Sequence, residues 1–185
     1  MNRCLVLADL GQAQGNASVT GLRLALLVSS LQALQILMST GPGLDQVLSV
    51  LQGARNRLEY LTPNDWSLIL DKSKRISFKR GDVLVPQRKQ IKTIYLLVKG
   101  RVKVEVSKMK VAEVGPGEIC GEMAFLENSV SSATVIAAED IEAAAIEWSA
   151  LTALFELFPH MGSRFYRSIA VSLSRRLREQ IDPRR

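Results

Sequence analysis

The sequence predicts a mainly β domain of the α+β class, with helices before and after the β core. Between residues 76 and 147, apolar and polar residues alternate in short stretches, a period of two that is typical of strands with one buried face. Turn residues such as Gly81-Asp82 and Gly115-Pro116-Gly117 separate these stretches. On both sides of this region apolar residues recur at helical spacing. Short strands so arranged indicate a sandwich, a roll or a barrel.

The chain has room for one such core and a few accessory helices. It has 185 residues, of which 47% are hydrophobic and 23% charged, a balance that is ordinary for a globular protein. We expect a helical appendage over residues 1–58 and a folded domain over residues 59–185. The 24 basic and 18 acidic residues give a net charge of +6, which favours anionic partners without identifying one.

The cysteines and the first apolar stretch bear on the cellular location. Cys4 and Cys120 match neither a disulfide framework nor a metal site, which is typical of a reducing compartment, so we expect a cytoplasmic protein. The stretch Leu24–Met38 predicts a buried helix. It is short for a membrane span, which needs about 20 apolar residues, and membrane association is therefore the lesser alternative.

Two more helices are predicted before the strands. Apolar residues at helical spacing run from Leu44 to about Leu58. Thr62 is a typical N-cap and Pro63 suits the first helical position, so a short helix is expected over residues 62–72.

Seven stretches between residues 76 and 147 predict the strands of the core. The clearest pair is 94–98 and 102–106, which we expect to form a hairpin through Lys99-Gly100. The other stretches begin near residue 76 or lie at 83–85, 111–114, 133–138 and 141–146.

The chain continues in helices over residues 149–181. Ser149 is expected to cap a first helix that reaches Phe158, and a longer helix should run from about His160 to Ile181. The basic stretch 175–178 would interact favourably with the negative end of this last helix. One apolar residue recurs at every fourth position, which must cover a core or another helix: Met161, Phe165, Ile169, Leu173, Leu177 and Ile181.

Catalytic chemistry finds little support in the sequence. His160 is the single histidine, and neither an HExxH nor a CxxC motif is present. We therefore expect neither an enzyme nor a metal site.

The most informative stretch is GPGEICGEMAFL at residues 115–126, followed by SSATV at residues 131–135. A glycine turn after a strand can bring backbone N–H groups close to a phosphate, and a carboxylate beside it can accept hydrogen bonds from a sugar hydroxyl. Placed between an alternating pair of strands and an Ala-Thr-Val strand, with helices on both flanks, this stretch resembles the cyclic nucleotide-binding domain family. The resemblance covers about residues 61–177.

The resemblance implies an eight-stranded antiparallel β-roll of the jelly-roll type, whose phosphate-binding cassette runs from residue 121 to residue 134. It implies that Glu122 holds the ribose 2′-hydroxyl of a ligand such as cAMP or cGMP, with no other cofactor. The implied ligand-binding residues are Gly121, Glu122, Met123, Ala124, Ser131, Ser132, Ala133 and Thr134.

One departure from the family pattern concerns the phosphate. The family's cassette carries an arginine that pairs with the cyclic phosphate, and by spacing this position falls at Ser131 or Ser132, with no arginine between Arg101 and Arg164. A hydroxyl donates one neutral hydrogen bond, whereas a guanidinium offers a charged, bidentate pair. A lysine from elsewhere is a possible substitute, with Lys92, Lys103 and Lys110 as candidates.

Two functions remain open from the sequence. The first is a non-catalytic regulatory domain that binds a cyclic nucleotide or a similar small anion and relays occupancy through its flanking helices. The alternative is a ligand-free roll that serves as an interaction or dimerisation module. We expect the protein either to form a homodimer through residues 169–181 or to bind a partner protein. We do not expect DNA binding, because Arg185 leaves no room for the helix-turn-helix of catabolite-activator-type transcription factors.

Overall fold

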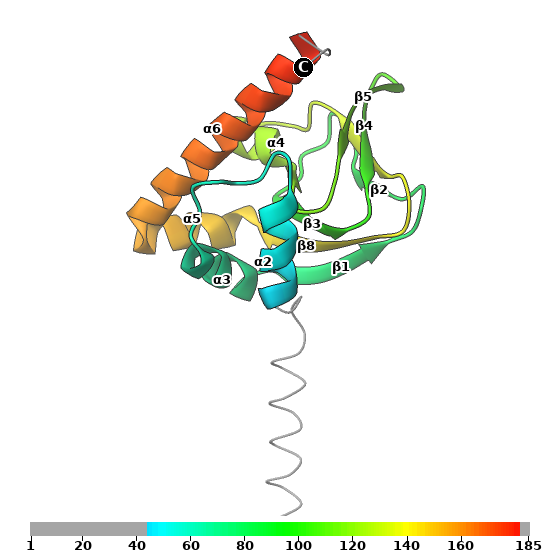
Figure 1. Cartoon of the computed structure of the whole chain (residues 1–185). Helices are drawn as coiled ribbons and strands as arrows, with labels where there is room; N and C mark the ends of the chain where they lie inside the picture. Colours follow the sequence, from blue (N-terminus) through cyan, green and yellow to red (C-terminus); the bar gives the residue numbers. More distant parts are fainter. Residues whose placement is uncertain (1–43, 182–185) are drawn as a thin grey trace, which may run out of the picture. The chain divides into compact units, whose positions relative to one another are not determined.

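The computed structural model describes residues 44–181, where helices pack against one side of a two-sheet β structure (Figure 1). These residues belong to one unit of the chain, which begins at residue 41. The predicted helix Leu24–Met38 lies outside the described residues. Within residues 44–181, each helix is too short or too polar to cross a membrane.

Within the described residues, two helices precede the β structure. Helix α2 spans Leu44–Gly53 and ends at a glycine, five residues before the predicted end, so residues 54–62 form a loop. Helix α3 spans Pro63–Asp71 and has the predicted N-cap. The Thr62 hydroxyl accepts a hydrogen bond from the Asp65 amide at 3.2 Å, and the Asp65 carboxylate accepts one from the Thr62 amide at 2.8 Å. This reciprocal pair is a capping box, which fixes the start of α3.

Eight strands form two antiparallel sheets. The first sheet has the strand order β1-β8-β3-β6 and the second has the order β2-β7-β4-β5. Helix α4, Glu122–Glu127, lies between β6 and β7 in the sequence. The strands are β1 (Lys74–Phe78), β2 (Val83–Val85), β3 (Thr93–Lys99), β4 (Val102–Val106), β5 (Met109–Val114), β6 (Ile119–Cys120), β7 (Thr134–Ala137) and β8 (Ile141–Glu147).

The strand pairing is nested about the middle of the chain. Strand β4 pairs with β5, β3 with β6, β2 with β7 and β1 with β8, each pair antiparallel. This is the jelly-roll form of the β-roll, so the predicted eight-stranded fold is confirmed. Only β6 has no counterpart among the predicted strands, because two residues are too few to show an alternation.

The predicted hairpin of residues 94–98 and 102–106 is wrong. Strand β3 lies in the first sheet, where it pairs with β8 and β6, whereas β4 lies in the second sheet and pairs with β5 and β7. The chain therefore crosses from one sheet to the other at Gly100. Both segments form strands as predicted, but β3 is buried on both faces, and the residue pattern of one strand does not identify its partner.

The crossing at Gly100 packs against a second crossing between β7 and β8. Gly100 has a positive φ of 78°, and a Cβ there would lie 2.7 Å from the carbonyl oxygen of Asp140. The Ala138 amide donates to the Arg101 carbonyl at 3.0 Å. The two corners of the roll thus hold each other, and only glycine fits the first of them.

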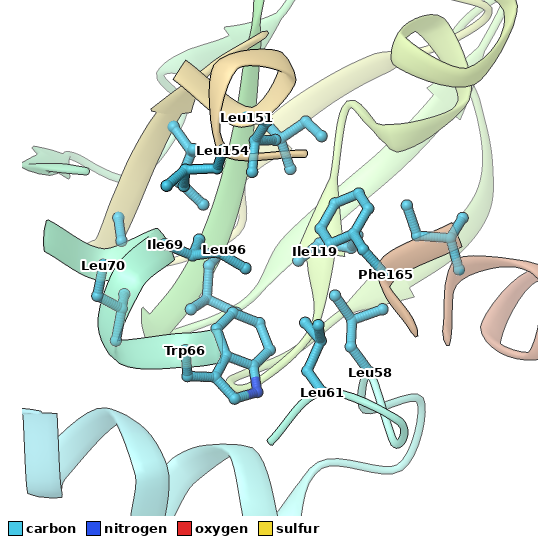
Figure 2. Packing of buried hydrophobic residues seen from close by; sticks show 14 of the residues in the cluster. Leu58, Leu61, Trp66, Ile69, Leu70, Leu96, Ile119, Leu151, Leu154 and Phe165 are labelled. Carbon is cyan, nitrogen blue, oxygen red and sulfur yellow. The ribbon is translucent and has the colours of Figure 1, made fainter. Parts of the chain in front are cut away.

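The hydrophobic core has two parts, one on each face of the first sheet. Leu96 and Leu97 are both fully buried, and as consecutive strand residues they point to opposite faces. Leu97 belongs to the cluster between the two sheets, and Leu96 to the cluster under the helices. Figure 2 shows Leu96 of the sheet together with Trp66 and Ile69 of α3, on the side that the helices cover.

Two helices follow the roll. Helix α5 spans Trp148–Leu157 and α6 spans Pro159–Ile181. The prediction that Ser149 caps α5 is wrong, since the N-cap is Glu147 and no side chain caps this helix. The buried Trp148 instead fixes the start, because its amide donates to the Lys92 carbonyl at 2.9 Å.

The apolar stripe of α6 changes its surroundings along the helix. Met161, Phe165 and Ile169 are at most 2% exposed and pack into the core under the helices, whereas Leu177 is 58% and Ile181 75% exposed. Residues four apart drift around a helix with 3.6 residues per turn, so the stripe leaves the core as α6 extends beyond it.

Candidate ligand-binding cavity

A cavity of about 740 Å³ lies between the inner face of the second sheet, α4 and the C-terminal half of α6. Its volume lies within the range of about 300–1,000 Å³ that is usual for small-molecule sites. The wall is mostly aliphatic, and polar side chains are few. The polar residues that line it are Glu122, Ser131, Ser132, Arg176 and Gln180.

The aliphatic wall is largely one row of side chains that crosses the second sheet. In the antiparallel register Val85 pairs with Val135, Val135 with Val104, and Val104 with Ala112. All four residues line the cavity. A row with one small or β-branched side chain from each strand gives a broad apolar surface, suited to the flat body of a ligand.

The start of α4 forms the opposite rim. Gly121 precedes it with a φ of 89°, and a Cβ at Gly121 would lie 2.9 Å from the Thr93 carbonyl oxygen, so a glycine is required. Glu122 then begins the helix with only 5% of its surface exposed. Ala124 is buried as well, while Met123 is 43% exposed at the mouth of the cavity.

The structure brings together seven of the eight residues that the family resemblance implied. Gly121, Glu122, Met123, Ala124, Ser131, Ser132 and Ala133 all line the cavity. Thr134 does not. Its neighbour Val135 points into the cavity, so Thr134 faces the other side of β7, where its hydroxyl accepts a hydrogen bond from the Gln87 amide at 3.2 Å.

Ser131 is held in place by its own loop. Its hydroxyl donates to the Ala133 carbonyl at 2.6 Å, and its amide donates to the Lys89 carbonyl at 2.9 Å. Only 6% of the residue is exposed. At the first of the two expected arginine positions the side chain is thus short, neutral and engaged in shaping the turn, and the second position, Ser132, is an exposed serine that also lines the cavity.

The cation of the cavity comes from α6 instead. Nη1 of Arg176 donates to Oε1 of Glu122 at 2.7 Å, and Nη2 donates to the Ile119 carbonyl at 3.1 Å. The Arg176 side chain is 21% exposed and that of Glu122 is 6% exposed. Sequence reasoning missed Arg176 because it assigned residues 175–178 to the helix dipole, whereas the structure gives Arg175 and Arg176 separate carboxylate partners.

The lysines that the sequence offered as substitutes do not line the cavity. Lys92 donates to Asn128 at 3.1 Å and lies over the ring of Trp148. Lys103 and Lys110 pair with carboxylates of their own hairpin. Among the residues that the structure describes around this cavity, Arg176 supplies the positive charge.

Burial controls the ionisation of two groups in the wall. It raises the pKa of the Glu122 carboxyl above its usual value, although the nearby Arg176 guanidinium works in the opposite direction. Burial also raises the pKa of the Cys120 thiol far above its usual range. A thiol in this state is a poor nucleophile, so Cys120 acts as an apolar part of the wall.

The cavity is connected to the loop between α2 and α3 through α6. One residue before Arg176, Arg175 pairs with Glu59 of that loop. Ser172 is buried, and its hydroxyl donates to the Asn56 carbonyl at 3.2 Å. The Asn56 amide in turn donates to Glu118, in the turn that leads to the cassette, at 3.1 Å. The C-terminal half of α6 thus contacts the cavity and the loop before α3 at once.

This arrangement suits reversible binding. In the part of the chain that the structure describes, no three acidic, histidine or cysteine side chains gather in a way that would hold a metal ion. The cavity offers an apolar wall, a buried carboxylate that accepts hydrogen bonds and a guanidinium that donates them.

Comparison with known proteins shows which family and which structures this domain is similar to. Residues 75–157 match the family model described as "Cyclic nucleotide-binding domain". Cyclic GMP-binding protein C of Dictyostelium discoideum is 29% identical over 128 residues, 66% of this chain and 5% of that protein. Cyclic AMP receptor protein of Thermus thermophilus is 30% identical over 124 residues, 64% of this chain and 56% of that protein. A cyclic nucleotide-binding domain from Methylobacillus flagellatus superposes with a TM-score of 0.66 at 20% identity, over 76% of this chain and 82% of that one.

Residues 75–157 thus match the cyclic nucleotide-binding domain family model, as the sequence predicted, and the superposition at 20% identity supports the fold. The two curated relatives are longer, and the chain spans 5% and 56% of their lengths.

Proposed function

We propose that this chain is a non-catalytic regulatory domain that binds a cyclic nucleotide, cAMP or cGMP, in the cavity between the second sheet, α4 and α6. The observation that carries the proposal is the buried carboxylate of Glu122 at the start of α4, opposite an aliphatic wall. A purine base would cover the row of valines, and a ribose hydroxyl would donate to Glu122. The curated relatives named for cyclic GMP and cyclic AMP support this ligand class.

The relay of occupancy is part of the same proposal. Helix α6 lines the cavity with Leu173, Arg176 and Leu177, and it is tied to the loop before α3 by Ser172 and Arg175. A ligand that moved the C-terminal half of α6 would therefore pull on that loop as well. A reporter for the relay is the hydrogen exchange of residues 54–60 with and without ligand.

Calorimetric titration with cAMP and cGMP tests the proposal. Saturating heat in the micromolar range is expected for at least one nucleotide. Glu122→Ala should weaken binding by roughly 10- to 100-fold, because a hydrogen bond to a charged group is worth about 1.5–3 kcal/mol. Glu113→Ala, which removes an exposed carboxylate on β5 outside the cavity, is the matched control and should leave the affinity unchanged. Silence of the unaltered chain at millimolar nucleotide would overturn the proposal.

A ligand-free interaction module is the second candidate. Glu122 already has a partner in Arg176, and Ser131 already has one in Ala133, so these two polar groups have partners without a ligand. In that case the exposed end of the α6 stripe, Leu177 and Ile181, would be the working surface. The same titration separates the two candidates, since the module predicts no heat from either nucleotide.

A further inference from the structure

The cavity has a positive charge in an unexpected place. The cassette residue that would face a phosphate is Ser131 or Ser132, both uncharged, and the Ser131 hydroxyl is bonded to its own loop. Arg176, from the far end of the chain, reaches into the same cavity and holds both Glu122 and the Ile119 carbonyl. Two hydrogen bonds use only part of a guanidinium, which carries five N–H donors.

We propose that Arg176 binds the anionic group of the ligand and so takes over the role of the missing cassette arginine. The inference rests on the proposed function and names the residue that would bind the phosphate. Arg176 lines the cavity, its side chain is 21% exposed, and its contacts fix the guanidinium beside Glu122. A phosphate beside Arg176 would complete a row of carboxylate, guanidinium and phosphate in which the cation separates the two anions.

Arg176 is needed there for a second reason. Without it, an incoming phosphate would meet the buried Glu122 carboxylate, and two like charges in a poorly solvated site repel strongly. One cation thus attracts the ligand and screens the residue that would hold its ribose.

This position of the cation changes how occupancy reaches the rest of the domain. A cassette arginine would keep the phosphate contact within the roll. Arg176 places that contact on α6, next to Arg175 and its partner Glu59. The ligand would therefore bind α6 directly.

The test is calorimetric titration of the full chain with cAMP and cGMP. Arg176→Gln should weaken binding by about 30-fold or more, the loss expected when one partner of a buried charge pair is removed. Arg176→Lys keeps the charge and should recover part of the affinity. The matched control is Arg175→Gln, one position away on the same helix, whose partner Glu59 lies outside the cavity. It should bind like the unaltered chain.

A second pair of variants tests whether the weaker binding of Arg176→Gln comes only from a disturbed structure. Arg176→Gln alone leaves Glu122 buried and unpaired, so the pair Glu122→Gln and Glu122→Gln/Arg176→Gln is titrated as well, with thermal unfolding as the check of folding. The proposal expects the double variant to bind more weakly than the single one by a similar factor. Equal affinities in this pair, or unchanged affinity in Arg176→Gln, would overturn it while leaving nucleotide binding intact. If the unaltered chain binds neither nucleotide, the proposed function itself fails and the inference falls with it.

Discussion

Glu122 is the residue on which the electrostatics of the cavity depend. Its carboxyl is nearly inaccessible to water, and burial raises its pKa even with Arg176 at 2.7 Å. In the unfolded chain the same carboxyl ionises at its usual pKa. Between these two pKa values Glu122 is ionised in the unfolded state and protonated in the folded state. The contribution of this group to the free energy of unfolding therefore falls as the pH rises through that range.

We therefore expect Glu122→Gln to change how stability depends on pH. As the pH rises above the usual glutamate pKa of 4.5 toward the raised pKa of the folded state, the free energy of unfolding of the unaltered chain should fall relative to that of the variant, by about 1.4 kcal/mol for each unit by which the pKa is raised. Urea denaturation at several pH values measures this difference.

Glu59 is a suitable control, because its pKa is shifted in the opposite direction. The exposed Glu59 carboxyl is bonded to Arg175, which lowers its pKa. Its contribution to stability is therefore lost as the pH falls toward that lowered pKa, and Glu59→Gln should show its difference on the acid side. A Glu122→Gln difference that is constant with pH would contradict the burial of this carboxyl.

At the level of elements, the corner at Gly100 decides which sheet each strand joins. The sequence predicts that the strands on either side of Gly100 form a hairpin. In the structure the chain instead passes from one sheet to the other at this residue, which has a positive φ and packs on Asp140 and Ile141. A side chain at this position would require a positive φ, and its Cβ would lie 2.7 Å from the Asp140 carbonyl oxygen and 2.8 Å from the Ile141 side chain.

Gly100→Ala should consequently destabilise the roll by about 1–3 kcal/mol or more, through backbone strain and the close contact with the Asp140 carbonyl oxygen. Gly115→Ala is the matched control, because a Cβ at Gly115 would have no atom within 4 Å and its φ is not positive. The control should stay within about 0.5 kcal/mol of the unaltered chain. Equal denaturation midpoints for the two variants would show that the corner tolerates a side chain.

At the level of the whole molecule, the C-terminal end of α6 presents exposed apolar side chains among the described residues, and we expect self-association there. The predicted dimer seam ran from Ile169 to Ile181, but Ile169 is fully buried against its own roll and cannot contribute. Leu177 and Ile181 remain exposed at one end of α6. Burying an apolar side chain is worth about 1.5–3 kcal/mol, so these residues would support a weak to moderate dimer.

We expect a homodimer at tens of micromolar by light scattering, converted to a folded monomer by Leu177→Glu with Ile181→Glu, since the new charges would face each other across the seam. Met109→Glu, which alters a similarly exposed apolar residue on the β4–β5 hairpin, should leave the dimer intact. A monomer in the unaltered chain would mean that the exposed end of α6 serves another purpose.

The class of the fold, the resemblance to a family, the start of α3 and most of the cavity rim could be predicted from the sequence alone. These depend on local signals: the alternation of buried and exposed residues, the Thr62 cap, and the glycine and glutamate at positions 121 and 122. Each is carried by residues close together in the chain, so it can be read without knowing which elements meet.

Which strands pair, and where the cation of the cavity comes from, could be seen only in the folded chain. The first depends on partners up to about 70 residues apart, such as β1 and β8, which the alternation of one strand does not specify. The second joins Arg176 to Glu122 across 54 positions. Nothing near Arg176 in the sequence distinguishes it from Arg175, because the direction of each side chain is set by the packing of α6 on the roll.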